Sequence, residues 1–362
     1  MKHVTSRMAR AIAVGIVAIM SSGAAQAETR TLTYATYLPQ SFTWVQVDDW
    51  FMDEVEVRTE GRIKFERNYG GSLLGPVEVF PGVSSGAADL GTGGAVYNTD
   101  MLPLAGGLLL PFVTENADAA ARAFTDLSLS SGALAQEWKA ANLAPSYSLV
   151  ATENSFWTNK AIETTDDLKG MRIRASGGVA QVLQMLGATP VAMGMGDGVQ
   201  AFKSGAIDGF SAAPFDVSTL VGLQDIATHA GDAGRLGVYA AVTLAFNLNT
   251  WESLSEEDRA VISEVAAGAP AKYLEIADAS IAAAIDKIKA APQLKIVRTS
   301  PEVDAEWRQK TRETVWNGWI DELEAKGIPA RATFDEFRRL VAEKEPGSDY
   351  TPGFDRLQAE PN

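Results

Sequence analysis

Asp167-Leu168-Lys169-Gly170-Met171-Arg172-Ile173-Arg174-Ala175-Ser176-Gly177-Gly178 is the most informative stretch of this 362-residue chain. Its pattern predicts a turn, a short strand that ends at Arg174, and the start of a helix. The backbone N–H groups of Ser176, Gly177 and Gly178 follow at the expected helix N-terminus. A guanidinium next to free N–H donors favours a bound carboxylate. The alternative is an arginine that forms a salt bridge with a neighbouring acidic residue.

The segments around this stretch alternate between strand-like and helix-like patterns, which indicates an α/β protein. The chain is long enough for two lobes, each with its own core. We expect residues 28–150 to form the first lobe, with about 236–270 returning to it. Residues 151–235 are expected to form the second lobe, with about 271–345 added to it. Residues 346–362 are expected to be an irregular C-terminal tail.

The last third of the chain is predicted to be helical. Ser255 and Asp258 are typical of a capping box, and apolar residues then keep a helical period to about Lys289. Pro270 lies inside this run and should kink the helix. Pro301 is typical of the first turn of a further helix.

The N-terminus has the pattern of an export signal. Three basic residues precede a short apolar core at 11–20, and Ala25-Gln26-Ala27 matches a cleavage site. We therefore expect residues 1–27 to be a signal peptide that is cleaved after Ala27, and the protein to be periplasmic. A retained signal anchor is the alternative.

Composition excludes several classes of function. The formal net charge is −15, which argues against binding to nucleic acid or anionic membranes. The absence of cysteine excludes thiol nucleophiles, disulfides and cysteine-based metal sites. Once the leader is removed, His229 is the single histidine, so histidine-based zinc sites and most general-base schemes would depend on it. We predict no metal, no cofactor and no enzymatic activity.

The expected first lobe contains one hydrolase-like motif. Gly82-Val83-Ser84-Ser85-Gly86 matches G-x-S-x-G, but a nucleophile elbow follows a strand and precedes a helix. Here the predicted order is reversed, and a catalytic Ser84 would need His229 as its partner. The alternative is a helix end followed by a tight turn.

Two runs of aromatic residues follow predicted strands, where ligands bind in open α/β sheets. Phe156 and Trp157 belong to the first run, and Phe210, Ser211 and Phe215 belong to the second. Aromatic side chains are more often part of a core than of a ligand-binding wall. Both interpretations therefore stay open for each run.

Two glycine-rich turns, at 91–94 and 194–198, match neither the dinucleotide fingerprint nor the P-loop. Each would let the backbone approach a ligand closely, or would simply connect a strand to a helix. The further candidate binding residues are Gly94, Tyr97, Met195 and Tyr37, the last of which follows the first predicted strand.

Taken together, these residues resemble the solute-binding proteins of tripartite ATP-independent periplasmic (TRAP) transporters, the DctP family. The resemblance extends over nearly the whole chain after the leader. Besides residues 167–174, the motifs that carry it are Gly70-Gly71-Ser72-Leu73-Leu74-Gly75, Gly86-Ala87-Ala88-Asp89-Leu90-Gly91, Leu110-Pro111-Phe112, Ser204-Gly205-Ala206-Ile207-Asp208-Gly209 and Trp251-Glu252-Ser253-Leu254-Ser255-Glu256-Glu257-Asp258. The resemblance implies two α/β lobes around a ligand cleft, with a long kinked helix across both. It also implies that Arg174 binds the ligand carboxylate and that an integral-membrane permease is the partner.

The chain also departs from the family pattern. Many members have a second arginine near the position of Trp157, and many have Gln-Glu-Asn-Pro where this chain has Phe210-Ser211-Ala212-Ala213-Pro214. One arginine among apolar walls suits a monocarboxylate with an apolar or aromatic body better than sialic acid or a C4-dicarboxylate. We therefore predict a monomeric periplasmic receptor that captures a small organic acid by hinge closure and delivers it to a TRAP permease. The alternatives are a ligand sensor for a membrane kinase, a periplasmic hydrolase and an ATP-driven uptake receptor.

Overall fold

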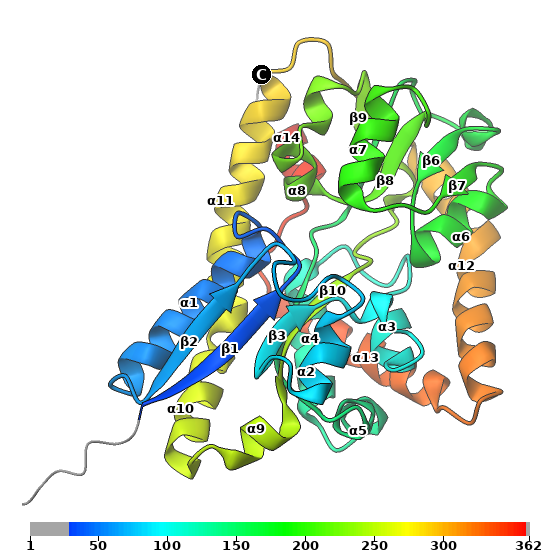
Figure 1. Cartoon of the computed structure of the whole chain (residues 1–362). Helices are drawn as coiled ribbons and strands as arrows, with labels where there is room; N and C mark the ends of the chain where they lie inside the picture. The colour runs from blue at the N-terminus through cyan, green and yellow to red at the C-terminus, as the bar shows by residue number, and fades with distance from the viewer. Residues whose placement is uncertain (1–28, 360–362) are drawn as a thin grey trace, which may run out of the picture.

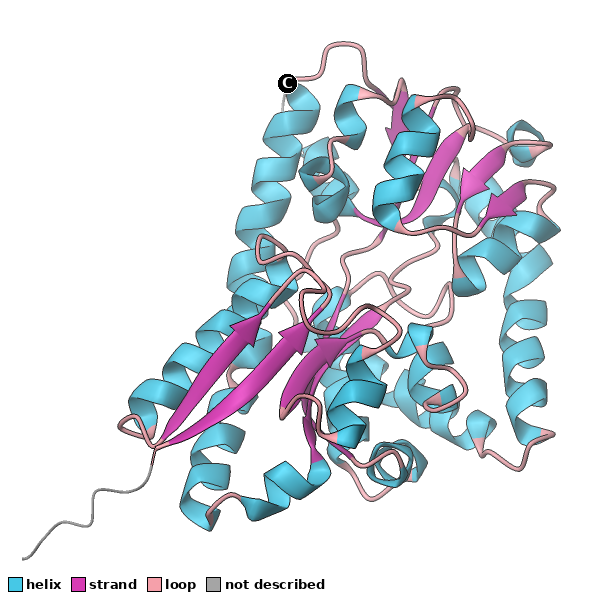
Figure 2. Ribbon diagram, in the orientation of Figure 1, coloured by secondary structure: helices cyan, strands magenta, loops and turns pink. Residues whose placement is uncertain are grey.

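The computed structural model describes residues 29–359, and its core is built on two separate β-sheets (Figures 1 and 2). The first sheet has the order β2-β1-β3-β10-β4, and the second has the order β11-β9-β5-β8-β6-β7. The strands of the first sheet are β1 (Arg30–Thr36), β2 (Ile63–Asn68), β3 (Leu90–Gly93), β4 (Leu143–Val150) and β10 (Ala241–Asn247). Those of the second are β5 (Asn154–Thr158), β6 (Arg172–Arg174), β7 (Thr189–Val191), β8 (Gly209–Pro214), β9 (His229–Gly231) and β11 (Lys295–Ile296).

Helices cover both sheets, so the chain forms two α/β lobes (Figure 2). The first lobe carries α1 (Thr43–Arg58), α2 (Val79–Ser85), α3 (Pro103–Gly107), α4 (Ala117–Leu129), α5 (Ala133–Ala140), α9 (Leu248–Ser253) and α10 (Glu256–Ala267). The second carries α6 (Gly177–Met185), α7 (Met195–Lys203), α8 (Phe215–Leu220) and α14 (Gly353–Ala359). Short 3-10 turns, η1 (Ala95–Tyr97), η2 (Thr165–Leu168), η3 (Leu223–Asp225), η4 (Ala233–Arg235) and η5 (Glu345–Gly347), connect these elements. Within residues 29–359, no helix combines the length and the apolar character needed to cross a membrane.

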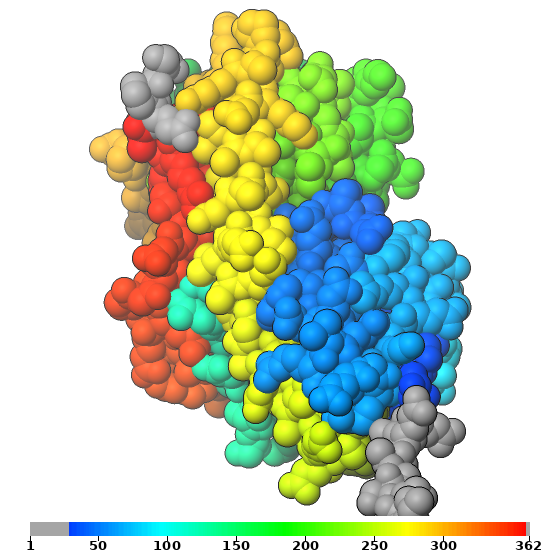
Figure 3. All heavy atoms as spheres, turned by 90° about the vertical axis from the view of Figure 1, so that its left-hand side faces the viewer, coloured from blue at the N-terminus to red at the C-terminus, as the bar shows by residue number. Residues whose placement is uncertain are grey.

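A long bent helix joins the two lobes, as the kink at Pro270 predicts. The helix α10 starts at the Ser255 N-cap, whose Oγ accepts a hydrogen bond of 3.0 Å from the Asp258 N–H. It gives way at Gly268 to α11 (Ala269–Lys289), with Pro270 in the first turn. The helix α11 packs against α1 of the first lobe and α8 of the second. Figure 3 shows it as a continuous yellow band along both.

Two further helices complete the connection on the opposite side (Figure 1). The helix α12 (Pro301–Glu324) begins at the Ser300 N-cap with a proline in its first turn, and packs on α6 of the second lobe. The helix α13 (Ala330–Lys344) then packs on α4 of the first lobe. We expected residues 271–345 to join the second lobe, and α13 departs from that expectation. The physical reason is its apolar face, in which Phe337 meets Phe124 of α4 with ring centroids 6.2 Å apart.

Residues 346–359 of the C-terminal segment include η5 and the helix α14, which corrects the expectation of an irregular tail over this part; residues 360–362 lie outside the described part of the chain. The segment crosses between the lobes and ends in α14, where Phe354 packs edge-on against Phe215 with ring centroids 4.9 Å apart. On the way, the Tyr350 hydroxyl and the Gly353 N–H each donate a 2.6 Å hydrogen bond to the Glu153 carboxylate. Burial raises the pKa of Glu153 to about 7.

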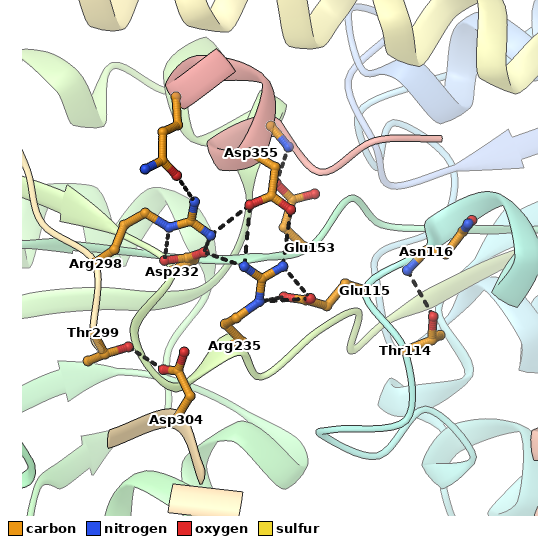
Figure 4. Close-up of polar contacts among 12 residues, drawn as sticks. Thr114, Glu115, Asn116, Glu153, Asp232, Arg235, Arg298, Thr299, Asp304 and Asp355 are labelled. Carbon is orange, nitrogen blue, oxygen red and sulfur yellow. Dashed lines mark hydrogen bonds and ion pairs between the residues drawn. The ribbon is translucent and has the colours of Figure 1, made fainter. Parts of the chain in front are cut away.

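A charged network supports the same crossing region (Figure 4). Arg235 pairs with Glu115 at 2.6 Å and with Asp355 at 3.1 Å. Arg298 pairs with Asp232 at 2.5 Å and with Asp355 at 2.7 Å. The C-terminal segment is thereby tied to the chain on both sides of the lobe junction.

Candidate functional site

Arg174 lies at the carboxyl end of β6, as its sequence context predicts. The strand is flanked by two parallel neighbours, with Arg174 opposite Val191 of β7 and Phe210 of β8. The residue is 7% exposed. In open α/β sheets, this edge is where ligands bind.

Backbone carbonyl groups hold the guanidinium in place. Its Nε donates to the Met193 carbonyl at 3.2 Å, and its Nη1 donates to the carbonyls of Ser211 at 3.2 Å and Ala212 at 2.6 Å. The guanidinium carbon also lies 4.9 Å from the centre of the Phe210 ring. These contacts fix the side chain without neutralising its charge.

A β-bulge explains how two successive carbonyls reach one nitrogen. Opposite β5, the register of β8 slips between the pairs Ser155–Ala213 and Trp157–Phe210, so that β8 contains one extra residue. Ala212 lies within the bulge at φ +50°, in the left-handed region that a non-glycine residue rarely adopts. Bulges re-aim backbone groups and are frequent beside functional sites.

The charge of Arg174 has no counter-ion in the structure. Among residues 29–359 no carboxylate forms an ion pair with Arg174, and its Nη2 has no hydrogen-bond partner. A buried charge without a partner is costly, and an anion that binds there relieves the cost. The arrangement could accept an anion, and among residues 29–359 Arg174 forms no salt bridge with a neighbouring acidic residue.

A cavity of about 530 Å³ opens in front of Arg174, between the two lobes. The second lobe contributes Arg174, the backbone of Ser176 to Gly178 and residues 192–194. The first lobe contributes Tyr97 and the segment around α3, and Tyr239 comes from the crossing segment before β10. The other lining side chains include Leu109, Leu110, Met193, Gln181, Asp100, Trp319, Glu322, Leu323 and Lys326.

The helix α12 closes one side of the cavity through tight packing. A Cβ atom on Gly107 of α3 would lie only 1.9 Å from the Trp319 indole nitrogen. The neighbouring Trp316 donates from its Nε1 to the Pro111 carbonyl at 2.8 Å. Gly178 likewise leaves room for Pro111, which a Cβ would meet at 2.6 Å. The absence of side chains at these glycines allows the lobes and α12 to approach closely.

The structure does not bring the four predicted aromatic residues to this cavity. Phe156, Trp157, Phe210 and Phe215 are each at most 2% exposed and lie in the core of the second lobe. The Trp157 indole donates to Ser155 Oγ at 2.8 Å, and Phe156 packs against Trp307. Phe156 and Trp157 of β5 and Phe210 of β8 are in interior strands of the sheet, which explains their burial. Phe215 begins α8 and is covered by Phe354 of α14. Phe210 contributes indirectly, beneath the Arg174 guanidinium.

The other predicted residues lie closer to the site. Tyr97 lines the cavity. Gly94 lies beneath Tyr37 and Tyr97, since a Cβ there would be 3.5 Å from atoms of each. Ser211 contributes its carbonyl to Arg174 and donates from its hydroxyl to Asn154 at 3.1 Å. Met195 is partly buried at the start of α7, and its neighbours 193 and 194 line the cavity instead.

Sequence reasoning missed Tyr239, Met193 and Trp319. Trp319 follows the helical period of a core-facing stripe, so its position at the cavity carried no separate signal. Tyr239 lies in a crossing segment next to a β-rich run. The one sequence signal for Tyr239 was that an aromatic residue lies where the chain crosses between the lobes.

The alternative sites receive no support from the geometry. Ser84 lies in the last turn of α2 in the first lobe, and His229 is in β9 of the second. In the described part of the chain, no group of histidine and acidic residues is arranged to hold a metal ion. A further hollow of about 640 Å³ lies between α4 and α10, and none of the predicted binding residues lines it.

Comparison with known proteins identifies the family. A family model described as bacterial extracellular solute-binding protein, family 7 (DctP), matches residues 34–321. A solute-binding protein of Chromohalobacter salexigens is 24% identical over 261 residues, which cover 69% of this chain and 74% of that protein.

Solved structures share the fold. A TRAP periplasmic solute-binding protein from Desulfovibrio salexigens, in an open form, has a TM-score of 0.75 at 25% identity, covering 88% of this chain and 98% of that one. A TRAP solute-binding protein from Rhodoferax ferrireducens, in complex with copurified benzoate, has a TM-score of 0.78 at 24% identity, covering 88% and 99%. The chain therefore belongs to the DctP family, the periplasmic solute-binding proteins of TRAP transporters.

Proposed function

We propose that this receptor captures a small monocarboxylate with an apolar or aromatic body. The observation that carries the proposal is Arg174, a buried guanidinium with no counter-ion among the described residues and one unused nitrogen. A carboxylate would supply the missing negative charge. The backbone N–H groups at the start of α6 would add further donors.

The walls of the cavity support an apolar or aromatic body. Near Arg174 they are formed by Tyr97, Tyr239, Met193 and Leu110. The one lysine that lines the cavity, Lys326, pairs with Glu322 at 2.8 Å, and both side chains are mostly exposed. A second carboxylate on the ligand would therefore find no free cation among the lining residues.

Relatives of this fold bind carboxylates of several kinds. The Rhodoferax protein holds benzoate, and a protein from Bordetella bronchiseptica holds mandelate. The Chromohalobacter protein of solved structure holds D-glucuronate. A uronate needs partners for several hydroxyl groups. The lining also contains polar side chains such as Asp100 and Gln181, but its aromatic and aliphatic side chains favour the first two bodies.

Capture would proceed by closure of the lobes. Arg174 belongs to the second lobe and Tyr97 to the first, so a ligand between them contacts both. Closure excludes water, which strengthens the attraction between the guanidinium and the carboxylate. The closed receptor would then dock on the permease and release its ligand there.

Calorimetry on the chain without residues 1–27 tests the proposal. The ligands are benzoate, phenylacetate, succinate and sialic acid, each titrated at the same pH and salt concentration. We expect a hydrophobic monocarboxylate to bind most tightly. Tighter binding of succinate or sialic acid than of every hydrophobic monocarboxylate would overturn the proposal.

We further propose that the mature protein begins at Glu28 and is monomeric. Residues 1–28 lie outside the described part of the chain, and the support is the A-x-A pattern that ends at Ala27. Intact mass of the protein exported from a bacterial host tests the cleavage site. Light scattering of the same sample tests the oligomeric state, and a stable dimer would contradict the second point.

A further inference from the structure

The chain contains eight tyrosines, and their hydroxyl groups fall into two sets. Five of them donate to a defined acceptor. The donor and acceptor pairs are Tyr34 and Tyr147 with Asp48, Tyr69 with Asp49, Tyr273 with the Val150 carbonyl, and Tyr350 with Glu153. Buried tyrosine hydroxyls usually have such a partner.

The remaining three, Tyr37, Tyr97 and Tyr239, have no hydrogen-bond partner outside their own group among residues 29–359. Tyr97 is 46% exposed, and Tyr37 and Tyr239 are partly buried, so their hydroxyl groups face the cleft rather than a fixed acceptor. We call them the cleft tyrosines. Tyr97 and Tyr239 line the cavity in front of Arg174, and Tyr37 packs edge-on against Tyr97 with ring centroids 5.6 Å apart at 83°. The three tyrosines without an outside partner therefore lie together at the proposed ligand site.

The topology of the first sheet brings the cleft tyrosines together. Tyr37 directly follows β1, which runs parallel to β3 with Thr36 opposite Thr92. Tyr97 ends η1, which follows β3. Tyr239 comes shortly before β10, which is antiparallel to β3. Three adjacent strands thus present one tyrosine each at the sheet edge that faces the second lobe.

The chemistry of the cleft tyrosines is that of neutral hydroxyls. Burial raises the pKa of Tyr37 and of Tyr239 above the ordinary value, so both hold their protons at neutral pH. The positive charge of Arg174 partly opposes the rise in the pKa of Tyr239, so the Tyr239 hydroxyl and the Arg174 guanidinium are close enough to interact electrostatically. A phenolic hydroxyl donates one hydrogen bond and accepts others, so it pairs well with a neutral hydroxyl.

We infer that the cleft tyrosines bind a hydroxyl group of the ligand, and that the substrate class is a hydroxy-monocarboxylate. The inference rests on the proposed function, in which Arg174 holds the carboxylate. In the closed site the ligand hydroxyl would pair with the Tyr239 hydroxyl or with the Tyr37–Tyr97 pair, in place of the water that reaches them in the open cleft. A ligand without the hydroxyl would exclude that water and offer no hydrogen-bond partner in exchange.

Matched pairs of acids test this inference by calorimetry. The first pair is 3-hydroxybenzoate and benzoate, and the second is mandelate and phenylacetate. We expect the hydroxylated member to bind more tightly by about tenfold or more in at least one pair, because one buried hydroxyl otherwise stays unsatisfied. The pair with the larger ratio shows whether the hydroxyl belongs to the ring or to the carbon next to the carboxylate.

Variants test whether the cleft tyrosines cause the difference in affinity between the hydroxylated acid and its unhydroxylated partner. For the acid pair with the larger affinity ratio in wild type, this ratio should fall toward one in Tyr239→Phe and in Tyr37→Phe. Tyr69→Phe is the matched control, because Tyr69 donates to Asp49 away from the cavity, and its ratio should equal that of wild type.

The outcomes separate this inference from the proposed function. Equal affinities within both pairs would overturn the hydroxyl inference and leave the monocarboxylate receptor in place. A wild-type preference that persists in both Tyr→Phe variants would show that other groups bind the hydroxyl, and would also overturn it. Failure of all four acids to bind, with succinate or sialic acid bound instead, would overturn both.

Discussion

Replacement of Arg174 by alanine is the most direct test of the site. In the closed complex, the variant would leave the ligand carboxylate buried without a counter-charge. Removal of one partner from a buried ion pair costs about 3–5 kcal/mol. At 1.4 kcal/mol for each factor of ten, this weakens binding by at least about a hundredfold. Arg174 is 7% exposed, so solvent offers little screening.

Two further variants make the measurement specific. Arg174→Lys retains the charge but loses the planar pair of donors, and we expect an intermediate affinity, weaker than wild type by about tenfold. Arg172→Ala is the control. Its guanidinium is at the other end of the same strand, where it pairs with Asp208 at 2.9 Å on the surface. Its affinity should match that of wild type.

The assay is isothermal titration of each purified variant with the tightest ligand of the panel, at low and at physiological salt. Urea unfolding of the ligand-free proteins accompanies it. The loss of binding should exceed any loss of stability, since ligand-free Arg174 is itself an uncompensated buried charge. A dissociation constant for Arg174→Ala within threefold of wild type would refute the role assigned to Arg174.

Two predictions concern the stability of the packing around the site. Burial raises the pKa of Glu153 from 4.5 to about 7, so between these pH values the folded protein holds a proton that the unfolded chain releases. The contribution of this proton to the unfolding free energy is complete below pH 4.5 and is lost as the pH rises to about 7. Unfolding free energies measured between pH 5 and 8 should therefore vary less in Glu153→Gln than in wild type, and equal pH dependence would contradict this. Gly107→Ala should lower the unfolding free energy by about 1–3 kcal/mol in urea titrations, because its Cβ would collide with the Trp319 indole. Gly318→Ala, which has open space around the new Cβ, is the control and should not destabilise; a Gly107→Ala protein as stable as this control would refute the packing argument.

The local signals in the sequence were sufficient for much of the architecture. The N-caps at Ser255 and Ser300 begin helices where they were expected, because a capping side chain acts within one turn. Pro270 predicted the bend of the long helix for an equally local reason. The turn, strand and helix around Arg174 follow from residues that are neighbours in the chain.

The placement of aromatic residues could not be predicted in the same way. Trp157 and Phe215 follow or end strands, as cavity residues do, but both are fully buried. Which aromatic side chains are covered depends on α12 and α14, where Trp307 meets Phe156 and Phe354 meets Phe215, and both helices are far away in the sequence. Trp319 reaches the cavity for the converse reason, since α12 lies across the junction of the lobes.

The sequence by itself determined the family of the protein and predicted Arg174 as the residue that binds the ligand head group. Composition excluded cysteine-based chemistry and left a single histidine after the leader, and the family pattern pointed to a carboxylate at Arg174. Only the tertiary structure decided what surrounds that arginine. Three carbonyls, two of them from the bulge at Ala212, hold the guanidinium without neutralising it. Three adjacent strands bring together the cleft tyrosines. Both arrangements depend on strand register and on packing between distant segments, which no local pattern records.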